Sequence, residues 1–247
     1  MGSEMCIRDR NKREQQRKIK GQKQRAAKQR VQTRQLMMKI ALFGVAPILL
    51  FFVGYTLYNQ GPTYSPVEIV ENDHIRGQIN NPVSIVVYAD FQCPACATEH
   101  QTMTRLWPSI SDKARLIFRH FPITVSHQHS WTAALYAEAA ARQGQFWEMH
   151  DYLFATQTIW ARLPTVEDEF ESYALELNLD VERLNADLDS DEIVQKVRSD
   201  QRGGNASGVR STPAVFINGR LLTSPTRSRI VQSVNEEFEK ASETAAE

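Results

Sequence analysis

The sequence predicts an α/β protein in which a mixed sheet carries a helical insertion and is preceded by one transmembrane helix. Three patterns predict this fold class. An apolar run covers 40–58 without a charge, and the β-branched run Val83–Tyr88 is followed soon after by a helical pattern. Near the end of the chain, Asn218-Gly219 lies between two short runs and is a strong hairpin signal.

The charges are distributed unevenly along the chain, although 29 basic and 29 acidic side chains cancel. Residues 1–39 hold 13 Lys/Arg against 3 Asp/Glu, whereas residues 59–247 hold 16 against 26. The 19 uncharged residues between them match the ~20 apolar residues that cross a bilayer. The length of this run and of the basic arm favours an uncleaved signal anchor over a cleaved signal peptide. A buried core helix is the alternative interpretation.

Basic residues that flank a transmembrane helix stay in the cytoplasm, which gives the predicted orientation. The arm 1–39 is expected inside, the anchor 40–58 in the cytoplasmic (inner) membrane, and the rest on the periplasmic or extracellular face. Residues 59–66 are rich in Gly, Pro, Ser and Thr and are expected to form a linker, followed by one domain over 67–247. The arm is interpreted as a topology signal that touches anionic lipid, and no nucleic-acid partner is predicted.

The first half of the domain is expected to form a strand, a helix and a second strand. The run Val83–Tyr88 is nearly continuous and apolar, as in a central strand that is covered on both faces. A helical pattern begins at Ala95, and Pro108 is expected to end or kink that helix. The second strand is expected over 114–121. Because a helix connects the two strands, they are predicted to be parallel.

A helical insertion is expected over about residues 130–203. The helices expected within it cover 131–142, 146–154 and segments that begin near Thr165, Asp180 and Ser190. Thr165-Val166-Glu167-Asp168 resembles a capping box, while Asp180 and Ser190 are suitable N-caps. The glycine-rich residues 203–208 are expected to form a flexible connector.

The domain is expected to end in a hairpin and a helix. Residues 213–217 are predicted to form a strand and 220–223 its antiparallel partner, which makes the sheet mixed. Ser224-Pro225 has the pattern of an N-cap followed by a first-turn proline, so a final helix is expected from there to about residue 241.

Two cysteines are expected to carry the chemistry of the domain. Cys93 and Cys96 are the only cysteines beyond the predicted anchor, since Cys6 lies in the basic arm. A disulfide between residues three apart closes a loop too short to stabilise a fold much, so the pair is interpreted as reactive. Cys93 falls at a predicted helix start, where free N–H groups favour the reactive thiolate, and Pro94 suits the first helical position.

Two segments resemble a known family. The segment YADFQCPAC at 88–96 resembles the active site of the DsbA-like thiol–disulfide oxidoreductases, which have the thioredoxin fold. The segment GVRSTPAVFING at 208–219 resembles the second motif of that family, and the helical stretch between the two also fits. The resemblance covers about residues 66–240 and implies a thioredoxin-like mixed sheet. The two motifs together are specific, whereas either alone would be much weaker.

The resemblance implies a role for each matching residue. Cys93 would exchange disulfides with the substrate, and Cys96 would be the more buried resolving thiol. Thr212 and Pro213 would form a cis-proline loop that faces the dithiol and offers backbone groups to a substrate peptide. An ordinary edge-strand proline is the alternative interpretation of Pro213.

Three residues beside the cysteines are expected to modulate them. Pro94-Ala95 stands where the strongest oxidants of the family have Pro-His, and the loss of a cationic His predicts a weaker oxidant. Asp90 either helps to move protons or is a hydrogen-bonded residue at the end of a strand, and both interpretations stay open. His100 is interpreted as a solvated residue on the helix face.

These observations predict an enzyme, a protein disulfide oxidoreductase that oxidises exported cysteine-containing proteins with the help of a membrane or periplasmic redox partner. A disulfide reductase or isomerase of the same fold stays open, because C-x-x-C proteins span about −270 to −120 mV. A thioredoxin-like chaperone or copper-handling module also stays open. No cofactor and no metal are predicted; the rival metal interpretation uses Cys93, Cys96 and His100 as ligands.

Overall fold

The computed structural model describes residues 37–39, 43–44, 48, 51–52 and 67–246. Its contacts divide the chain into two units, Met1–Pro62 and Thr63–Glu247. Within the described ranges, no helix is both long enough and apolar enough to cross a bilayer. The predicted arm 1–39 and anchor 40–58 lie mostly outside these ranges, and the predicted linker 59–66 lies wholly outside them.

A mixed sheet forms the centre of the second unit. Its strand order among the described residues is β1-β3-β2-β4-β5. The strands are β1 (His74–Arg76), β2 (Val83–Ala89), β3 (Ala114–His120), β4 (Ala214–Ile217) and β5 (Arg220–Leu221). Strands β2 and β3 are parallel as predicted, whereas β1, β4 and β5 pair antiparallel with their neighbours. The predicted mixed sheet is thus confirmed, and β1 is an edge strand that the sequence did not reveal.

The central strand β2 is buried along its whole length because both faces of the sheet are covered. Val83, Ile85 and Val87 point into the larger core. Val86 and Tyr88 point into the smaller core on the opposite face. This alternation explains why the strand is a nearly continuous apolar run in the sequence.

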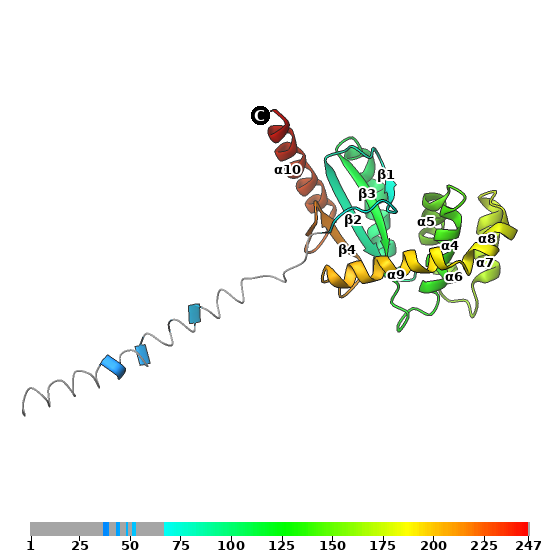
Figure 1. Ribbon diagram of the computed structural model, residues 1–247, viewed down its shortest axis with the longest axis horizontal. Coiled ribbons are helices and arrows are strands. Elements are labelled where there is room, and N and C mark those ends of the chain that lie inside the picture. Colours follow the sequence, from blue (N-terminus) through cyan, green and yellow to red (C-terminus); the bar gives the residue numbers. More distant parts are fainter. Residues whose placement is uncertain (1–36, 40–42, 45–47, 49–50, 53–66, 247) are drawn as a thin grey trace, which may run out of the picture. The chain divides into compact units, whose positions relative to one another are not determined.

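Eight helices are described in this unit, and six of them form the insertion between β3 and β4. They are α3 (Pro94–Leu106), α4 (Ser130–Ala141), α5 (Phe146–Ala155), α6 (Gln157–Trp160), α7 (Glu167–Glu176), α8 (Val181–Leu188), α9 (Asp191–Ala206) and α10 (Arg227–Ala246). Figure 1 shows α4 to α8 gathered beside the sheet, while α9 runs back from them toward the strands.

Several predicted helix ends are confirmed. The helix after β2 begins at Pro94, and it gives way before Pro108 to a 3₁₀ turn, Trp107–Ser109. The side chains of Asp180 and Ser190 accept hydrogen bonds from backbone N–H groups in the first turns of α8 and α9. These two caps leave fewer free N–H groups at the helix starts.

The flexible connector predicted over 203–208 is wrong, because α9 continues through Gly203 and Gly204 to Ala206. A methyl group at Gly204 would lie 2.7 Å from Cδ2 of Phe121. Glycine therefore allows α9 to approach the sheet closely at this point. The helices of the insertion run from Ser130 to Ala206, slightly beyond the predicted 130–203.

Two further predicted caps are wrong. Helix α7 has Val166 as its N-cap without a side-chain hydrogen bond, so Thr165 does not form a capping box. Acidic residues in its first turn supply the negative charge that a helix start favours. Ser224 has a φ of +57° and lies in a bend before the helix, and the hydroxyl of Thr226 instead accepts a hydrogen bond from the N–H of Arg229. The last helix therefore begins at Arg227.

Candidate active site

Cys93 lies at the junction of β2 and α3. Its backbone is extended, with φ −75° and ψ 120°, so it is the N-cap residue and Pro94 takes the first helical position. The carbonyl oxygen of Cys93 accepts hydrogen bonds from the N–H groups of Cys96 at 3.0 Å and Ala97 at 3.2 Å. The strand end and the proline therefore place the first sulfur beside the unpaired N–H groups of the helix.

The thiol of Cys93 is strongly activated. A hydrogen bond with the Cys96 thiol is the main reason that its pKa falls to about 5, and this outweighs the opposing effect of burial. The N–H groups of Cys96 and Ala95 and the side chain of Thr212 lower the pKa further. At neutral pH Cys93 is thus mostly thiolate, the form that reacts with disulfides.

Cys96 has the opposite character. Its side chain is wholly buried, and this burial raises its pKa far above the usual range. The charge on Cys93 raises it further, while the backbone of Asp90 and the side chain of Thr212 lower it. Because Cys96 stays protonated, it donates a hydrogen bond to the Cys93 thiolate, and the pair combines one nucleophile with one proton donor.

The loop before β4 faces the dithiol, as the family resemblance implied. The Thr212–Pro213 peptide bond is cis, and the Cys93 thiol lies 3.7 Å from the carbonyl oxygen of Thr212. The Thr212 hydroxyl oxygen is buried and has no hydrogen-bond partner among the described residues. The structure therefore brings together all four residues for which a catalytic or substrate-binding role was predicted. Binding of substrate by Thr212 and Pro213 stays a prediction.

Asp90 is buried at the end of β2, where both its carboxylate oxygens are engaged. One accepts from the N–H of Gln92 at 2.8 Å, and the other from the N–H of Ile123 at 2.8 Å, with His127 Nδ1 also at 2.8 Å. These contacts correspond to the strand-end interpretation, and a role of the carboxylate in proton movement stays a prediction. The other two predicted modulators, Pro94 and Ala95, are exposed in the first turn of α3.

Two glutamines for which no role was predicted from the sequence join the active-site loop to the helical insertion. Gln157 Nε2 donates to the carbonyl oxygens of Phe91 at 2.6 Å and Cys93 at 2.9 Å. Gln92 accepts from the N–H of His129 at 2.7 Å. Gln92 lies inside the recognised motif, but no local pattern indicates that Gln157, 64 residues beyond Cys93, contacts the loop.

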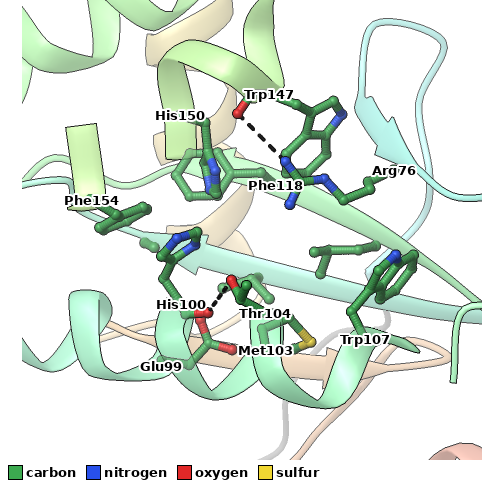
Figure 2. A pocket seen from close by; sticks show the side chains of 13 residues that line it. Arg76, Glu99, His100, Met103, Thr104, Trp107, Phe118, Trp147, His150 and Phe154 are labelled. Carbon is green, nitrogen blue, oxygen red and sulfur yellow. Dashed lines mark hydrogen bonds between the residues drawn. The ribbon is translucent and has the colours of Figure 1, made fainter. Parts of the chain in front are cut away.

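A narrow pocket lies beside α3, about one helical turn beyond Cys96 (Figure 2). Figure 2 shows Glu99 and His100 of α3 on one side of it and His150 and Phe154 of α5 on the other. Its free space of about 20 Å³ holds about one water molecule. Burial raises the pKa of Glu99 to about 7, so this side chain exchanges protons near neutral pH. His100 therefore faces a pocket and not open solvent, which corrects its predicted place.

The described residues contain two groups of three side chains that could hold a metal ion. One is His100, His150 and Asp151, and the other is His74, His120 and Glu138. Neither group contains Cys93 or Cys96, so the described structure does not support the metal interpretation that rests on the two cysteines.

Comparison with known proteins identifies the family. Residues 70–236 match the Thioredoxin_4 model, which is described as thioredoxin. The chain is 37% identical over 174 residues to the Na(+)/H(+) antiporter NhaA of Herminiimonas arsenicoxydans, a match that covers 70% of this chain and 27% of the relative. It is 30% identical over 197 residues to NhaA 1 of Mycolicibacterium gilvum, covering 73% and 30% respectively. The chain thus spans less than a third of the length of these relatives.

Solved structures share the fold at low sequence identity. BdbD from Bacillus subtilis superposes with a TM-score of 0.65 at 19% identity, covering 72% of this chain and 100% of that one. The α-DsbA1 protein of Wolbachia pipientis gives a TM-score of 0.62 at 19% identity, covering 72% and 96%. The family match shows that the chain belongs to the thioredoxin family, and the solved structures show that it shares the fold of DsbA-like proteins.

Proposed function

We propose that this member of the thioredoxin family is a protein disulfide oxidoreductase that works as an oxidase and transfers the Cys93–Cys96 disulfide to exported proteins that carry pairs of cysteines. The observation that carries the proposal is the asymmetric dithiol, with a pKa of about 5 at Cys93 and a buried, protonated Cys96. A stabilised thiolate favours the reduced form of the enzyme, and an enzyme that is stable when reduced readily gives up its disulfide.

The transfer proceeds in two exchanges. A substrate thiolate attacks the sulfur of Cys93, the Cys93–Cys96 bond breaks, and Cys96 takes up a proton as a mixed disulfide forms. A second substrate thiolate then attacks the substrate sulfur of the mixed disulfide, and Cys93 leaves as a thiolate. Two substrate thiols have been oxidised and one enzyme disulfide has been reduced. The low pKa of Cys93 speeds the second exchange, because a thiol of low pKa is a better leaving group.

The loop at Thr212 is a suitable place for the substrate peptide. The Thr212 carbonyl oxygen lies 3.7 Å from the Cys93 sulfur, so a peptide joined to that sulfur would pass close to this backbone. Pairing of an extended peptide with such a backbone binds it without demanding a particular sequence. This geometry supports a broad range of substrates. In the proposal, the anchor 40–58 holds the enzyme near the membrane, and a membrane or periplasmic redox partner reoxidises its dithiol to the disulfide.

The redox potential of the full-length chain in detergent tests the direction of transfer. Because a pKa of about 5 lies between the values of about 7 for thioredoxin and about 3.5 for DsbA, we expect a potential between about −270 and −120 mV. The protein should also oxidise a reduced, unfolded substrate, and Cys93→Ser should abolish this activity. A potential at or below about −270 mV would identify a reductase instead. Faster repair of a scrambled substrate than oxidation of a reduced one would identify an isomerase.

A further inference from the structure

A cluster of two histidines and one glutamate lies outside the dithiol site. His74 comes from β1, His120 from the end of β3, and Glu138 from α4. The Nε2 atoms of His120 and His74 lie 2.7 and 2.8 Å from the same carboxylate oxygen of Glu138. One donor atom from each residue lies within 4.8 Å of the other two. Since three separate elements supply the donors, the tertiary fold itself brings them together.

The carboxylate of Glu138 is buried without a permanent positive charge beside it. Its side chain is 7% exposed, that of His120 is 1% exposed and that of His74 is 18% exposed. Among the described residues no lysine or arginine pairs with Glu138, and nearby Lys196 instead contacts both carboxylate oxygens of Asp200 at 2.7 Å. A buried anion is costly unless a cation accompanies it, so the cluster is suited to a positive ion.

The second group of possible ligands differs in this respect. Asp151 already pairs with the guanidinium of Arg76 at 2.7 Å, and its other oxygen lies 2.8 Å from Nδ1 of His150. The negative charge there is therefore balanced by an arginine. The group formed by His100, His150 and Asp151 thus serves as an internal control for the cluster around Glu138.

The two imidazole rings of the cluster are held by aromatic neighbours. His74 stacks on Phe146 with ring centres 3.6 Å apart and an angle of 8° between the rings. His120 meets Phe118 edge to face at 5.3 Å. Rings that are fixed by packing keep their Nε2 atoms directed at one point, which lowers the cost of forming a metal site.

A solvent-accessible groove leads to the cluster. Its volume is about 400 Å³, and its lining includes His74 and Glu138 together with Arg142, Glu192 and Lys196. The groove provides an entry path for an ion and room for a water molecule as an additional ligand.

We propose that His74, His120 and Glu138 bind one divalent transition-metal ion of the zinc type, with a further coordination position open to the groove. Two imidazole nitrogens and one carboxylate oxygen form a ligand set that zinc uses in proteins. Imidazole nitrogens favour zinc and its neighbours over calcium and magnesium, which prefer oxygen ligands alone. The cluster contains neither redox cysteine, so the proposal is independent of the proposed oxidase function.

The tautomer of His120 limits the expected affinity. With an ion on Nε2, the ring proton of His120 must move to Nδ1, which is buried and has no hydrogen-bond partner among the described residues. Metal-bound histidines usually have such a partner, and its loss costs about 10–100-fold in affinity. We therefore expect micromolar binding, weaker than that of a typical structural zinc site.

Metal titration of the full-length chain tests the proposal. The dithiol is first oxidised to its disulfide and Cys6 is then alkylated, so that no free thiol can bind metal. Zinc is titrated by calorimetry, and cobalt is used as a coloured substitute whose visible bands report its ligands. X-ray absorption of the zinc-loaded wild-type chain reports whether nitrogen and oxygen, without sulfur, surround the ion. This last measurement does not depend on a variant that folds.

Three variants separate the two histidine clusters. His74→Gln and Glu138→Gln should each weaken zinc binding by more than about 100-fold. This exceeds the effect of removing a residue that only hydrogen-bonds to a metal ligand, which is about 10–100-fold. His100→Gln, in the control group, should leave binding unchanged. One zinc per chain with this pattern supports the proposal. The proposal would be overturned if zinc bound more weakly than about 100 µM or if both cluster variants still bound it. It would also be overturned if His100→Gln abolished binding, or if the absorption spectrum showed sulfur ligands.

Discussion

The side chain at position 95 influences how strongly the start of α3 favours a thiolate. Ala95 is exposed, and its N–H group helps to lower the pKa of Cys93. We predict that Ala95→His lowers this pKa by roughly one pH unit, because an imidazolium adds positive charge beside the thiolate. Titration of the thiolate absorbance measures the effect. Thr98→His places the same ring one turn further along α3 and should change the pKa much less; an equal shift in both variants would contradict the prediction.

The hydroxyl of Thr212 is a second influence on Cys93. It is buried, and it lowers the pKa of that thiol. Replacement by the similarly shaped valine should raise the pKa of Cys93 and so slow its alkylation by iodoacetamide at pH 6. Ser211→Ala, at the exposed neighbouring position, is the matched control. Equal alkylation rates in the wild type and in Thr212→Val would show that the hydroxyl has no influence.

At the residue scale, the reacting sulfur atoms could be predicted from the sequence, but not all the groups that position them. Cys93 and Cys96 were found from their spacing and their place at a helix start. Thr212 and Pro213 were found only through a family resemblance, because they lie more than a hundred residues away. Gln157 was missed since its two bonds to the active-site loop depend on how α6 packs against that loop. Contacts of this kind have no local signature in the sequence.

In helix α9, the two neighbouring glycines Gly203 and Gly204 should differ in how replacement by alanine changes the stability of the domain. A methyl group at Gly204 would lie 2.7 Å from Phe121, whereas at Gly203 the nearest atom, the Tyr88 hydroxyl oxygen, would lie 3.4 Å away. Gly204→Ala should destabilise the domain by about 1–3 kcal/mol through overpacking. Gly203→Ala should stabilise it by up to about 1 kcal/mol, because alanine favours the helix. Urea unfolding measures both changes, and a stabilising Gly204→Ala would refute the close approach of α9 to the sheet.

At the element scale, the sequence predicted those strands and helices whose burial or capping leaves a periodic pattern. Strand β2 was predicted from a nearly continuous apolar run, β3 from the segment 114–121 that Pro122 ends, and α8 and α9 from Asp180 and Ser190. Strand β1 was missed because His74–Arg76 is too short to show alternation. The glycines of α9 were misread as a connector, since their low helix propensity is outweighed by close packing against Phe121 and Tyr88.

The stability of the whole domain should depend on pH when the dithiol is reduced. The pKa of Cys93 is about 5 in the folded state and about 8.5 in an unfolded chain, so the unfolded state binds more protons between these values. The free energy of unfolding of the reduced protein is therefore expected to rise by roughly 2 kcal/mol from pH 5 to pH 7. This stabilisation is lost as the pH falls back toward 5.

The disulfide form lacks this ionisation and provides the comparison. Urea unfolding of the reduced and oxidised chains at pH 5 and pH 7 measures the difference between them, and Cys93→Ser should remove the extra pH dependence. If the free energies of unfolding of the reduced and oxidised chains changed equally with pH, the depressed pKa of Cys93 would be contradicted.

The arrangement of the full chain in the membrane is a further prediction. The basic arm 1–39 is expected in the cytoplasm and the domain outside, with the uncharged run 40–58 between them. An alkaline phosphatase reporter, active only outside the cytoplasm, should be active when fused after residue 66 and inactive when fused after residue 36. Reversal of six Lys/Arg in the arm to Glu should weaken this orientation. Activity of the fusion after residue 36 would contradict it.

The complete burial of Cys96 also affects how the molecule responds to peroxide. Peroxide is expected to reach the Cys93 thiolate, which is 8% exposed, sooner than Cys96, which is 0% exposed, and to convert Cys93 to a sulfenic acid. The thiol of Cys96 then condenses with the sulfenic acid, water leaves, and the ordinary disulfide is restored before irreversible oxidation to the sulfinic acid occurs. The burial of Cys96 thus protects the dithiol from irreversible oxidation, because the reaction with peroxide ends in the disulfide form of the protein.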